Sequence, residues 1–527
     1  MSPLLALLAL VPAAAAAAAA LLGHRRVETT GRIAAGAATI NVALALAVLV
    51  ATLGSGPLSF GALLYANTLS AVLIVLVTSV GAIVQVFGRR YLRAEAVQPR
   101  FYAASGVLLA ATIAMVAAGT LVGLTAAWIL SSIALVALLG MYAGVPGARD
   151  GVRRTAAAFL VADTALVAAT VIATSAWGTI RLSELAGRAT ELAGDEAAVT
   201  AVASLLVAAA VGRSAQLPLQ GWLPATLAAP TPVSALLHAG VVNAGGVLLI
   251  KLSPIFGASA VATHAAFALG AATAIYGTAL MLTKTDVKGA LTYSTMGQMG
   301  FMVMTCGLGA FAAATFHLIA HGLYKATLFL GSGSAIARAT RERKAPRAAV
   351  LTGGALRRAV AAALLTPALA VGAALAILSP SLSDKPGGVA LTLFAWATGA
   401  WMMWRWAARS PRLRAITAAG GLLIAATVAY LSAISGFAAV LEPSLAGAGT
   451  ATVSPWLLLA PMLVMAVTSL ALGTGRVAAA QRLTGRLYVA AQGAGHVYGS
   501  RAARAGGAGI ALNGVPRLTL QPQGGAS

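Results

Sequence analysis

The stretch "FHLIAHGLYKATLFLGSGSAI" (316–336) is an apolar run that carries three basic residues, His317, His321 and Lys325, spaced four positions apart. Each step of four residues turns an α-helix by about 40° beyond a full turn, so the three side chains lie near one face. The stretch contains no acidic residue. The sequence therefore predicts a helix that holds a row of titratable groups in apolar surroundings.

The composition predicts that the whole chain lies in a membrane. Of its 527 residues, 60% are hydrophobic and only 9% are charged, and the mean hydropathy is +0.90. A soluble protein carries about a quarter charged residues. The apolar runs are long and continuous, which disfavours a β-barrel of short alternating strands.

Fifteen apolar runs are long enough to cross a bilayer as helices. They span approximately 2–22, 33–53, 66–87, 103–120, 121–142, 155–177, 197–220, 232–252, 259–283, 288–309, 311–337, 356–378, 388–408, 415–440 and 454–473. We therefore expect an all-α polytopic membrane protein with about 15 transmembrane helices.

The basic residues, which give a net charge of +23, gather in alternate loops. Examples are Arg25 and Arg26 after the first run, Arg89 and Arg90 after the third, and "RERK" (341–344) after the eleventh. Such loops face the cytoplasm, which predicts an outside N-terminus and a cytoplasmic C-terminus in the inner (plasma) membrane. Because the charge sets topology in contact with lipid, we expect no nucleic-acid binding.

Two runs are interrupted. The segment 212–240 holds Pro218, Pro224, Pro230 and Pro232, and proline ends or breaks a helix. The segment 329–339 contains the glycines of the second interruption, Gly331 and Gly333. Broken helices at membrane depth are tolerated where they line a polar cavity, and a pair of them indicates inverted repeats around an ion path.

These features predict a division of the chain into five parts. They are N-terminal transmembrane helices (1–100), a first antiporter-like half (101–252), a second half (253–408), C-terminal transmembrane helices (409–475) and a basic, Gly-rich cytoplasmic tail (476–527).

Titratable residues inside spans are costly and are therefore candidates for function. Asp163 is the only acid well inside a predicted span, and we expect it to pair with Arg213. His238 lies inside a further span. Lys251 and Arg405 lie near helix ends, where a long basic side chain can extend to the membrane surface.

A metal site is disfavoured for the row at 317–325. Two histidines four residues apart have a zinc-type spacing, but no glutamate completes an HExxH motif and Lys325 would repel a cation. The single cysteine, Cys306, excludes a cysteine cage. We therefore expect no metal and no cofactor in this chain.

A proton relay fits the row better, because histidine titrates near neutral pH and a buried lysine can exchange its proton. Ser294, Gln298 and Tyr324 are expected to hold relay water. No phosphate loop, dinucleotide loop or Ser/His/Asp arrangement is present in the sequence, so we expect a transporter subunit rather than an enzyme.

Three motifs resemble one family. They are the segment 212–252, "TDVKGALTYSTMGQMGFM" (285–302) and the stretch 316–336. Together, in this order, they resemble the proton-conducting antiporter-like subunits of respiratory complex I and of multisubunit sodium/proton antiporters. The resemblance implies ion-pathway roles for the residues that match its channel positions, namely His238, Lys288, His317, His321 and Lys325.

Other positions depart from the pattern of that family. Arg213 stands where the family has a lysine, and its usual glutamate is missing from "TAAWILSSIAL" (125–135). Asp163 is the candidate replacement for that glutamate. Lys385, in "SLSDKPGG" (381–388), corresponds loosely to the lysine of the second broken helix.

The segment "LHAGVVNAGG" (237–246) resembles one branch, the DabB-type membrane subunits of DAB inorganic-carbon accumulation complexes. This resemblance implies conduction of protons, possible conduction of sodium, and a large soluble partner (DabA-like) on the cytoplasmic face. That partner would carry a zinc site like that of β-carbonic anhydrases, and the pair would trap carbon dioxide as bicarbonate.

Two alternatives stay open from sequence. One is a subunit of a complex I-like NADH-quinone oxidoreductase or of a multisubunit cation/proton antiporter. The other, suggested by Arg213 and the missing glutamate, is a membrane scaffold that binds a soluble partner without conducting.

Overall fold

The computed structural model describes residues 2–23, 25–142, 144, 146–334, 353–378 and 388–448, and these residues are mainly helical. The helices before the first interruption are α1 (Pro3–Leu22), α2 (Val27–Ser55), α3 (Thr68–Tyr91), α4 (Gln98–Val116), α5 (Leu121–Leu139), α6 (Pro146–Trp177), α7 (Ala189–Ala193) and α8 (Glu196–Arg213). The later helices are α9 (Thr231–Ala239), α10 (Ala244–Lys251), α11 (Ser253–Phe256), α12 (Ala260–Met281), α13 (Val287–Gly307), α14 (Phe311–Leu330), α16 (Gly353–Leu378), α17 (Gly388–Arg409) and α18 (Leu413–Leu441).

Eleven spans in the described residues are long and apolar enough to cross a membrane, one of them formed by α9 and α10 together. Three further helices, α13, α14 and α17, have 20 to 22 residues but are not among the eleven. Fourteen of the fifteen predicted runs coincide with these helices, and the run 454–473 lies outside the described residues. A polytopic helical membrane protein is therefore confirmed, whereas the count of fifteen spans and the inverted repeat are not.

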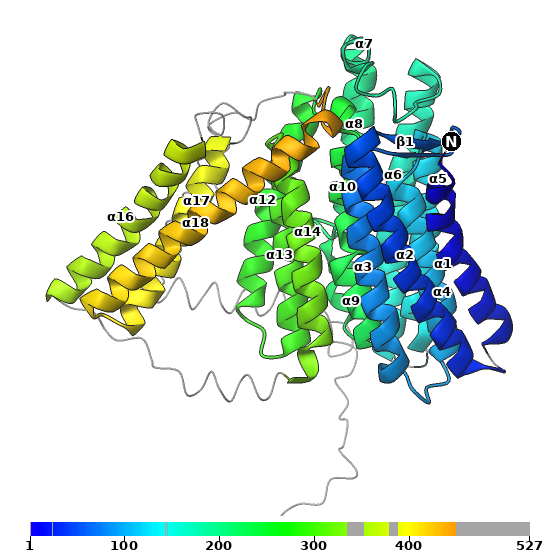
Figure 1. The fold of residues 1–527 in the computed structure, drawn as a ribbon, viewed down its shortest axis with the longest axis horizontal. Coiled ribbons are helices and arrows are strands. Elements are labelled where there is room, and N and C mark those ends of the chain that lie inside the picture. Colours follow the sequence, from blue (N-terminus) through cyan, green and yellow to red (C-terminus); the bar gives the residue numbers. More distant parts are fainter. Residues whose placement is uncertain are drawn as a thin grey trace, which may run out of the picture.

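The helices lie side by side in one bundle from α1 to α14, and α16, α17 and α18 extend from it (Figure 1). A continuous apolar core runs through the bundle from Leu5 to Phe329. Helix α18 crosses back over α14, and Ser444 just beyond it accepts a hydrogen bond from the Leu69 backbone at 3.3 Å. The division of the chain into two antiporter-like halves remains a prediction.

Polar side chains fix where several helices begin. Asn67, Thr120, Asp195, Ser259 and Asp286 precede α3, α5, α8, α12 and α13, and each accepts a hydrogen bond from a backbone N–H of the first turn. Such caps satisfy donors that have no partner within the helix. The short hairpin of β1 (Leu58–Phe60) and β2 (Leu64–Ala66) covers one end of the bundle, where its Ser59 carbonyl accepts from the Ser2 backbone.

The chain leaves α-helical geometry after Arg213 and returns to it only at Thr231. The four prolines of this segment each stand at a turn or a helix start. Pro218 follows a cis peptide bond, Pro224 opens a 3₁₀ turn, and Pro230 and Pro232 flank the first residue of α9. The second predicted interruption begins where α14 ends at Leu330, with Gly331 as its cap and Gly333 in a 3₁₀ turn, and residues beyond 334 lie outside the description.

The predicted run 232–252 corresponds to one span, but a 3₁₀ turn at Val241–Asn243 divides that span into α9 and α10. Gly240 has φ −121° and ψ −75°, outside helical geometry. Side chains satisfy the carbonyls at this turn, since Asn243 Nδ2 donates to the Ala239 oxygen at 2.8 Å and Ser214 Oγ to the Val242 oxygen at 2.6 Å. The interruption therefore leaves these two carbonyls with partners inside the membrane.

Helices α12 and α13 are in backbone contact through glycines. A side chain at Gly300 would meet the backbone of Ala274 and Gly270, and one at Gly277 would meet the backbone of Gly297. Small residues permit this close approach of helices in lipid. This contact fixes the position of α13 against α12. Helix α13 lies next to α14, which carries the row at 317–325.

Gly300→Ala is expected to destabilise the protein by about 1–3 kcal/mol, because the new methyl group overpacks a backbone contact. The thermal unfolding midpoint of the purified protein in detergent measures this. Gly372→Ala is the matched control, since nothing lies within 4 Å of the added methyl group, and it should leave the midpoint unchanged or raise it slightly. Equal midpoints for the two variants would contradict the packing described for α12 and α13.

Candidate functional site

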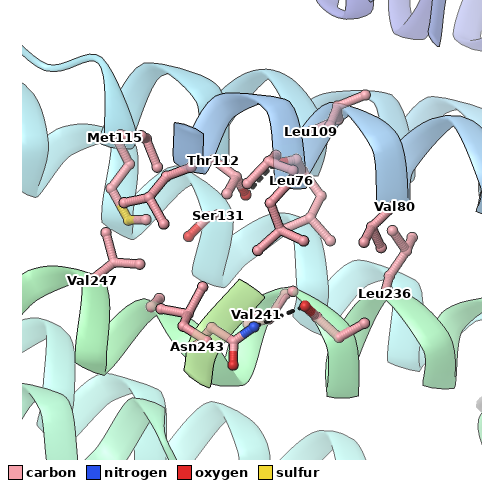
Figure 2. A pocket seen from close by; sticks show the side chains of 18 of the residues that line it. Leu76, Val80, Leu109, Thr112, Met115, Ser131, Leu236, Val241, Asn243 and Val247 are labelled. Atoms are coloured by element: carbon pink, nitrogen blue, oxygen red, sulfur yellow. Dashed lines mark hydrogen bonds between the residues drawn. The ribbon is translucent and has the colours of Figure 1, made fainter. Parts of the chain in front are cut away.

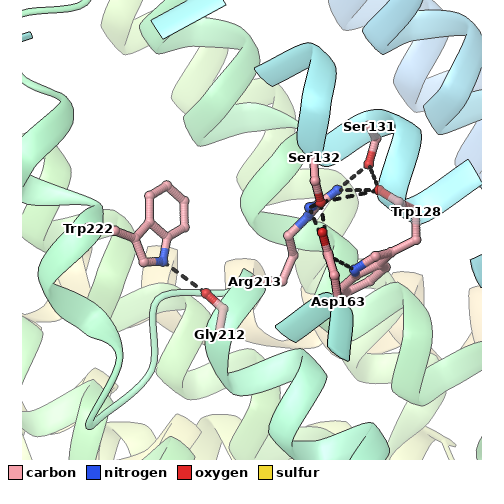
Figure 3. Close-up of polar contacts among 7 residues, drawn as sticks. All are labelled: Trp128, Ser131, Ser132, Asp163, Gly212, Arg213 and Trp222. Carbon is pink, nitrogen blue, oxygen red and sulfur yellow. Dashed lines mark hydrogen bonds and ion pairs between the residues drawn. The ribbon is translucent and has the colours of Figure 1, made fainter. Parts of the chain in front are cut away.

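Arg213 ends α8, and its side chain is only 1% exposed. The guanidinium lies between two aromatic rings, 4.6 Å from the centroid of Trp128 and 4.4 Å from that of Phe159. Trp222 packs edge-on against Phe159 and donates to the Gly212 carbonyl at 2.9 Å, so the segment after α8 folds back over it (Figure 3). Cation–π contacts with both rings stabilise the charge.

Helix α5 provides the acceptors for the guanidinium. Arg213 donates through Nη1 to Ser132 and through Nη2 to Ser131 and to the Trp128 carbonyl, the last at 3.3 Å. Ser131 in turn donates to the Trp128 carbonyl at 2.7 Å. Sequence reasoning missed both serines, although "WILSS" (128–132) places two hydroxyls one turn from Trp128 in an apolar span.

Asp163 on α6 belongs to the same cluster (Figure 3). Its Oδ1 accepts from Trp128 Nε1 at 2.7 Å and from Ser132 Oγ at 2.9 Å, and it lies 4.0 Å from Arg213 Nη1. The expected pairing of Asp163 with Arg213 is therefore present, with Ser132 between them as acceptor from one and donor to the other. We call Trp128, Ser131, Ser132, Asp163 and Arg213 the arginine cluster.

The second group of titratable residues lies on α14 and α9. His321 and Lys325 are buried and His317 is half-buried, and the rings of His317 and His321 are stacked with centroids 5.9 Å apart. His238, near the end of α9, is also buried and stacks on Phe329 at 4.2 Å. We call His238, His317, His321 and Lys325 the histidine–lysine row.

Hydrogen bonds orient the members of this row. Lys325 Nζ donates to Ser294 Oγ at 2.9 Å and to the Leu291 carbonyl at 3.3 Å, both on α13. His321 Nε2 bonds to the His238 carbonyl at 3.2 Å. A carbonyl only accepts, so Nε2 carries the proton and Nδ1 of a neutral ring keeps its lone pair.

Three ring nitrogens of the row are buried and lack a protein partner in the described residues: His238 Nδ1, His317 Nε2 and His321 Nδ1. No salt bridge in that part of the chain reaches any member of the row, in contrast to Arg213 with Asp163. Buried polar atoms of this kind are normally paired, so these nitrogens mark positions for water or for an exchanged proton.

The remaining predicted residues lie at different distances from the row. Gln298 contacts His317 through its backbone, and Ser294 holds Lys325, but the prediction for Tyr324 is wrong because its side chain is 61% exposed and turned away. Lys288 lies at the start of α13 and donates to the Ala229 carbonyl at 3.1 Å, outside the row. Lys385 falls outside the described residues.

A cavity of about 50 Å³ lies beside the arginine cluster. Ser131 and Arg213 border it on one side, and the α9–α10 turn from Ala239 to Asn243 borders it on the other (Figure 2). A water needs roughly 10–15 Å³ of such space, so there is room for about three to five. Most of the lining is apolar and comes from α3, α4 and the α9–α10 span, so any water inside would be held by a few polar groups. Within the described residues, no group of three or more His, Cys, Asp or Glu side chains converges as a metal site would require.

Comparison with known families places both groups of residues in one family. The model described as "NADH:quinone oxidoreductase/Mrp antiporter, TM" matches residues 118–374. A second model, "NADH-Ubiquinone oxidoreductase (complex I), chain 5 N-terminus", matches residues 52–102. The arginine cluster and the histidine–lysine row all lie within the first match.

Individual relatives divide between two kinds of complex. The "Probable inorganic carbon transporter subunit DabB1" of Halothiobacillus neapolitanus is 37% identical over 75% of this chain and 74% of its own length. NADH-quinone oxidoreductase subunit L of Mycobacterium tuberculosis is 34% identical, over 51% of this chain and 43% of its own. A chain in the Mrp complex structure from Dietzia sp. DQ12-45-1b shares the fold, with a TM-score of 0.60 and 24% identity, over 93% of this chain and 59% of that one.

Asp163→Asn is expected to destabilise the protein by about 3 kcal/mol, because Arg213 would keep its charge in a buried site without an acid. Thermal unfolding in detergent measures the change. Asp150→Asn removes the acid of an exposed pair with Arg154 and should cost at most about 1 kcal/mol. If the two variants unfold together, Asp163 does not compensate the buried charge.

Proposed function

Because the chain belongs to the NADH:quinone oxidoreductase/Mrp antiporter family of membrane subunits, we propose that it conducts protons as the membrane subunit of an inorganic-carbon accumulation complex. The observation that carries this proposal is the histidine–lysine row, in which four titratable side chains lie together without an acid. Buried titratable groups are costly in a membrane, and those that are present there commonly mark ion or proton pathways.

The geometry of the row suits proton exchange through water. The rings of His317 and His321 have centroids 5.9 Å apart, a distance that one water can bridge through their unpartnered nitrogens. His321 already donates through Nε2, so a proton that arrives at Nδ1 makes an imidazolium that can release either proton. Lys325 continues the face one turn further, with Ser294 as its neutral acceptor.

The arginine cluster has a different role in this proposal. Arginine stays protonated in proteins, so Arg213 acts as a fixed positive charge and does not pass protons on. Asp163 and the α5 serines hold that charge at the edge of the cavity. From there it opposes the entry of a second cation and biases where a proton can rest.

The inorganic-carbon branch is favoured by the extent of the similarity. The Halothiobacillus relative, named as a probable inorganic carbon transporter subunit, matches three quarters of both chains, whereas the Mycobacterium oxidoreductase subunit matches about half of this chain and less than half of its own. We therefore propose a large soluble zinc-binding partner (DabA-like) on the cytoplasmic face, where carbon dioxide would become bicarbonate. In this arrangement the N-terminus lies outside and the C-terminus inside, the chemistry belongs to the partner, and sodium is the second candidate ion.

Lys325→Ala is expected to lower proton flux by about a hundredfold or more, the range for loss of a positioned proton-transfer group. The measurement is the collapse of an imposed pH gradient in proteoliposomes that contain the complex with its partner. Lys284→Ala, at the turn before α13, is the control and should conduct normally. Undiminished flux in Lys325→Ala, in a complex that needs this chain to function, would favour the scaffold alternative.

Co-expression of this chain with its soluble partner is expected to restore growth in air to a bacterium that lacks carbonic anhydrase. Neither protein alone should do so, because conduction and hydration lie on different chains. The measurement is colony formation in air and in elevated carbon dioxide, with expression checked by immunoblotting. Failure in air despite good expression, together with a salt- or alkali-sensitive deletion strain, would indicate the antiporter or oxidoreductase alternative.

A further inference from the structure

Lys251, the last residue of α10, turns inward between two other helices instead of extending to the membrane surface as expected from its position. Its Nζ donates to Ser70 Oγ on α3 at 2.9 Å and to the carbonyl of Val116, the last residue of α4, at 2.6 Å. No salt bridge in the described residues involves it. Neither the arginine cluster nor the histidine–lysine row includes this amino group.

The surroundings of Lys251 adjoin the cavity. Val116 lines the cavity and also accepts the hydrogen bond from Nζ. Val247 lines it one turn before Lys251 on α10, and Leu73 lines it one turn after Ser70 on α3. Figure 2 shows Met115 and Val247 together at one end of the cavity, with Val80 and Leu236 at the other. Helices α3, α4 and α10, which meet at Lys251, therefore all contribute residues to the cavity wall.

The hydrogen bonds of Lys251 suit both protonation states. A neutral amine has two N–H donors and one lone pair, and the two acceptors, a hydroxyl and a carbonyl, use both donors. Protonation adds a third donor, which can face the cavity. Because no carboxylate in the described part of the chain pairs with Lys251, losing that proton again leaves no carboxylate without its partner. The only charged side chain among the cavity-lining residues is Arg213, which cannot release its proton.

We propose that Lys251 is a proton-exchange residue that passes protons between water in this cavity and the end of the bundle covered by the β1–β2 hairpin. The inference rests on the proposed function, because it requires that the chain conducts protons. It gives the cavity that Arg213 borders a lysine able to exchange protons, in addition to the fixed charge of Arg213.

A structural role alone would look different. The last carbonyls of a helix have no partner within it, and a lysine can cap them. If Lys251 only caps α4, arginine at this position would keep the charge and the donors and should conduct normally. Arginine cannot exchange its proton, so Lys251→Arg separates the two roles.

The experiment measures proton flux and the thermal unfolding midpoint for the complex in proteoliposomes and in detergent. We expect Lys251→Arg to assemble and unfold like the unmodified protein but to conduct at least about tenfold more slowly. Lys284→Arg, the same change at the turn before α13, should conduct normally. Unmodified flux in Lys251→Arg would overturn the inference, whereas an unmodified complex that carries no protons would overturn the proposed function itself.

A second variant tests the cavity without altering Lys251. Val247→Leu adds one methylene group to the lining and so reduces the space for water in the cavity. We expect flux to fall several-fold, with the Lys251 contacts retained and little change in unfolding midpoint. Flux equal to that of the unmodified protein would show that protons do not pass this way, and would overturn the inference even if Lys251→Arg fails to assemble.

Discussion

The structure depends on how the carbonyl groups of the interrupted span α9–α10 find donors inside the bundle. A helix that stops in a membrane exposes backbone oxygens that lipid cannot satisfy. Here three oxygens at the interruption receive side-chain donors, from His321, Asn243 and Ser214. These donors come from α14, from the turn itself and from the segment after α8. The interruption thus connects the two groups of the site. Helix α14 carries the histidine–lysine row, and Arg213 of the arginine cluster directly precedes Ser214.

The two groups of residues solve the problem of charge in a membrane in opposite ways. The arginine cluster surrounds a permanent charge with two aromatic faces, two hydroxyls and one carboxylate, so the charge stays in place. In the histidine–lysine row, His321 and Lys325 donate only to neutral acceptors among the described residues. A change in their protonation state therefore breaks no ion pair there. The cavity beside the arginine cluster has few polar groups, and transient wetting of such a constriction is one way in which channels gate.

Much of the architecture could be predicted from the sequence. Long apolar runs identify the membrane helices, a spacing of four places His317, His321 and Lys325 on one face, and the single acid well inside a predicted span identifies the partner of Arg213. The turn at Val241–Asn243 was missed because hydropathy does not distinguish a 3₁₀ turn from an α-helix. Tyr324 was misplaced because neighbouring residues in a helix lie about 100° apart around the axis. Contacts between distant segments, such as Ser131 with Arg213, require the fold.

The bond from His321 to position 238 ends on a backbone oxygen and not on the imidazole of His238. Every amino acid supplies that oxygen, so no substitution at position 238 removes the acceptor as long as the turn keeps its shape. The orientation of His321 is therefore encoded by the path of the chain at Gly240–Asn243. Mutational scans of position 238 will report on its imidazole alone, and the control of His321 has to be sought in the residues that shape the turn.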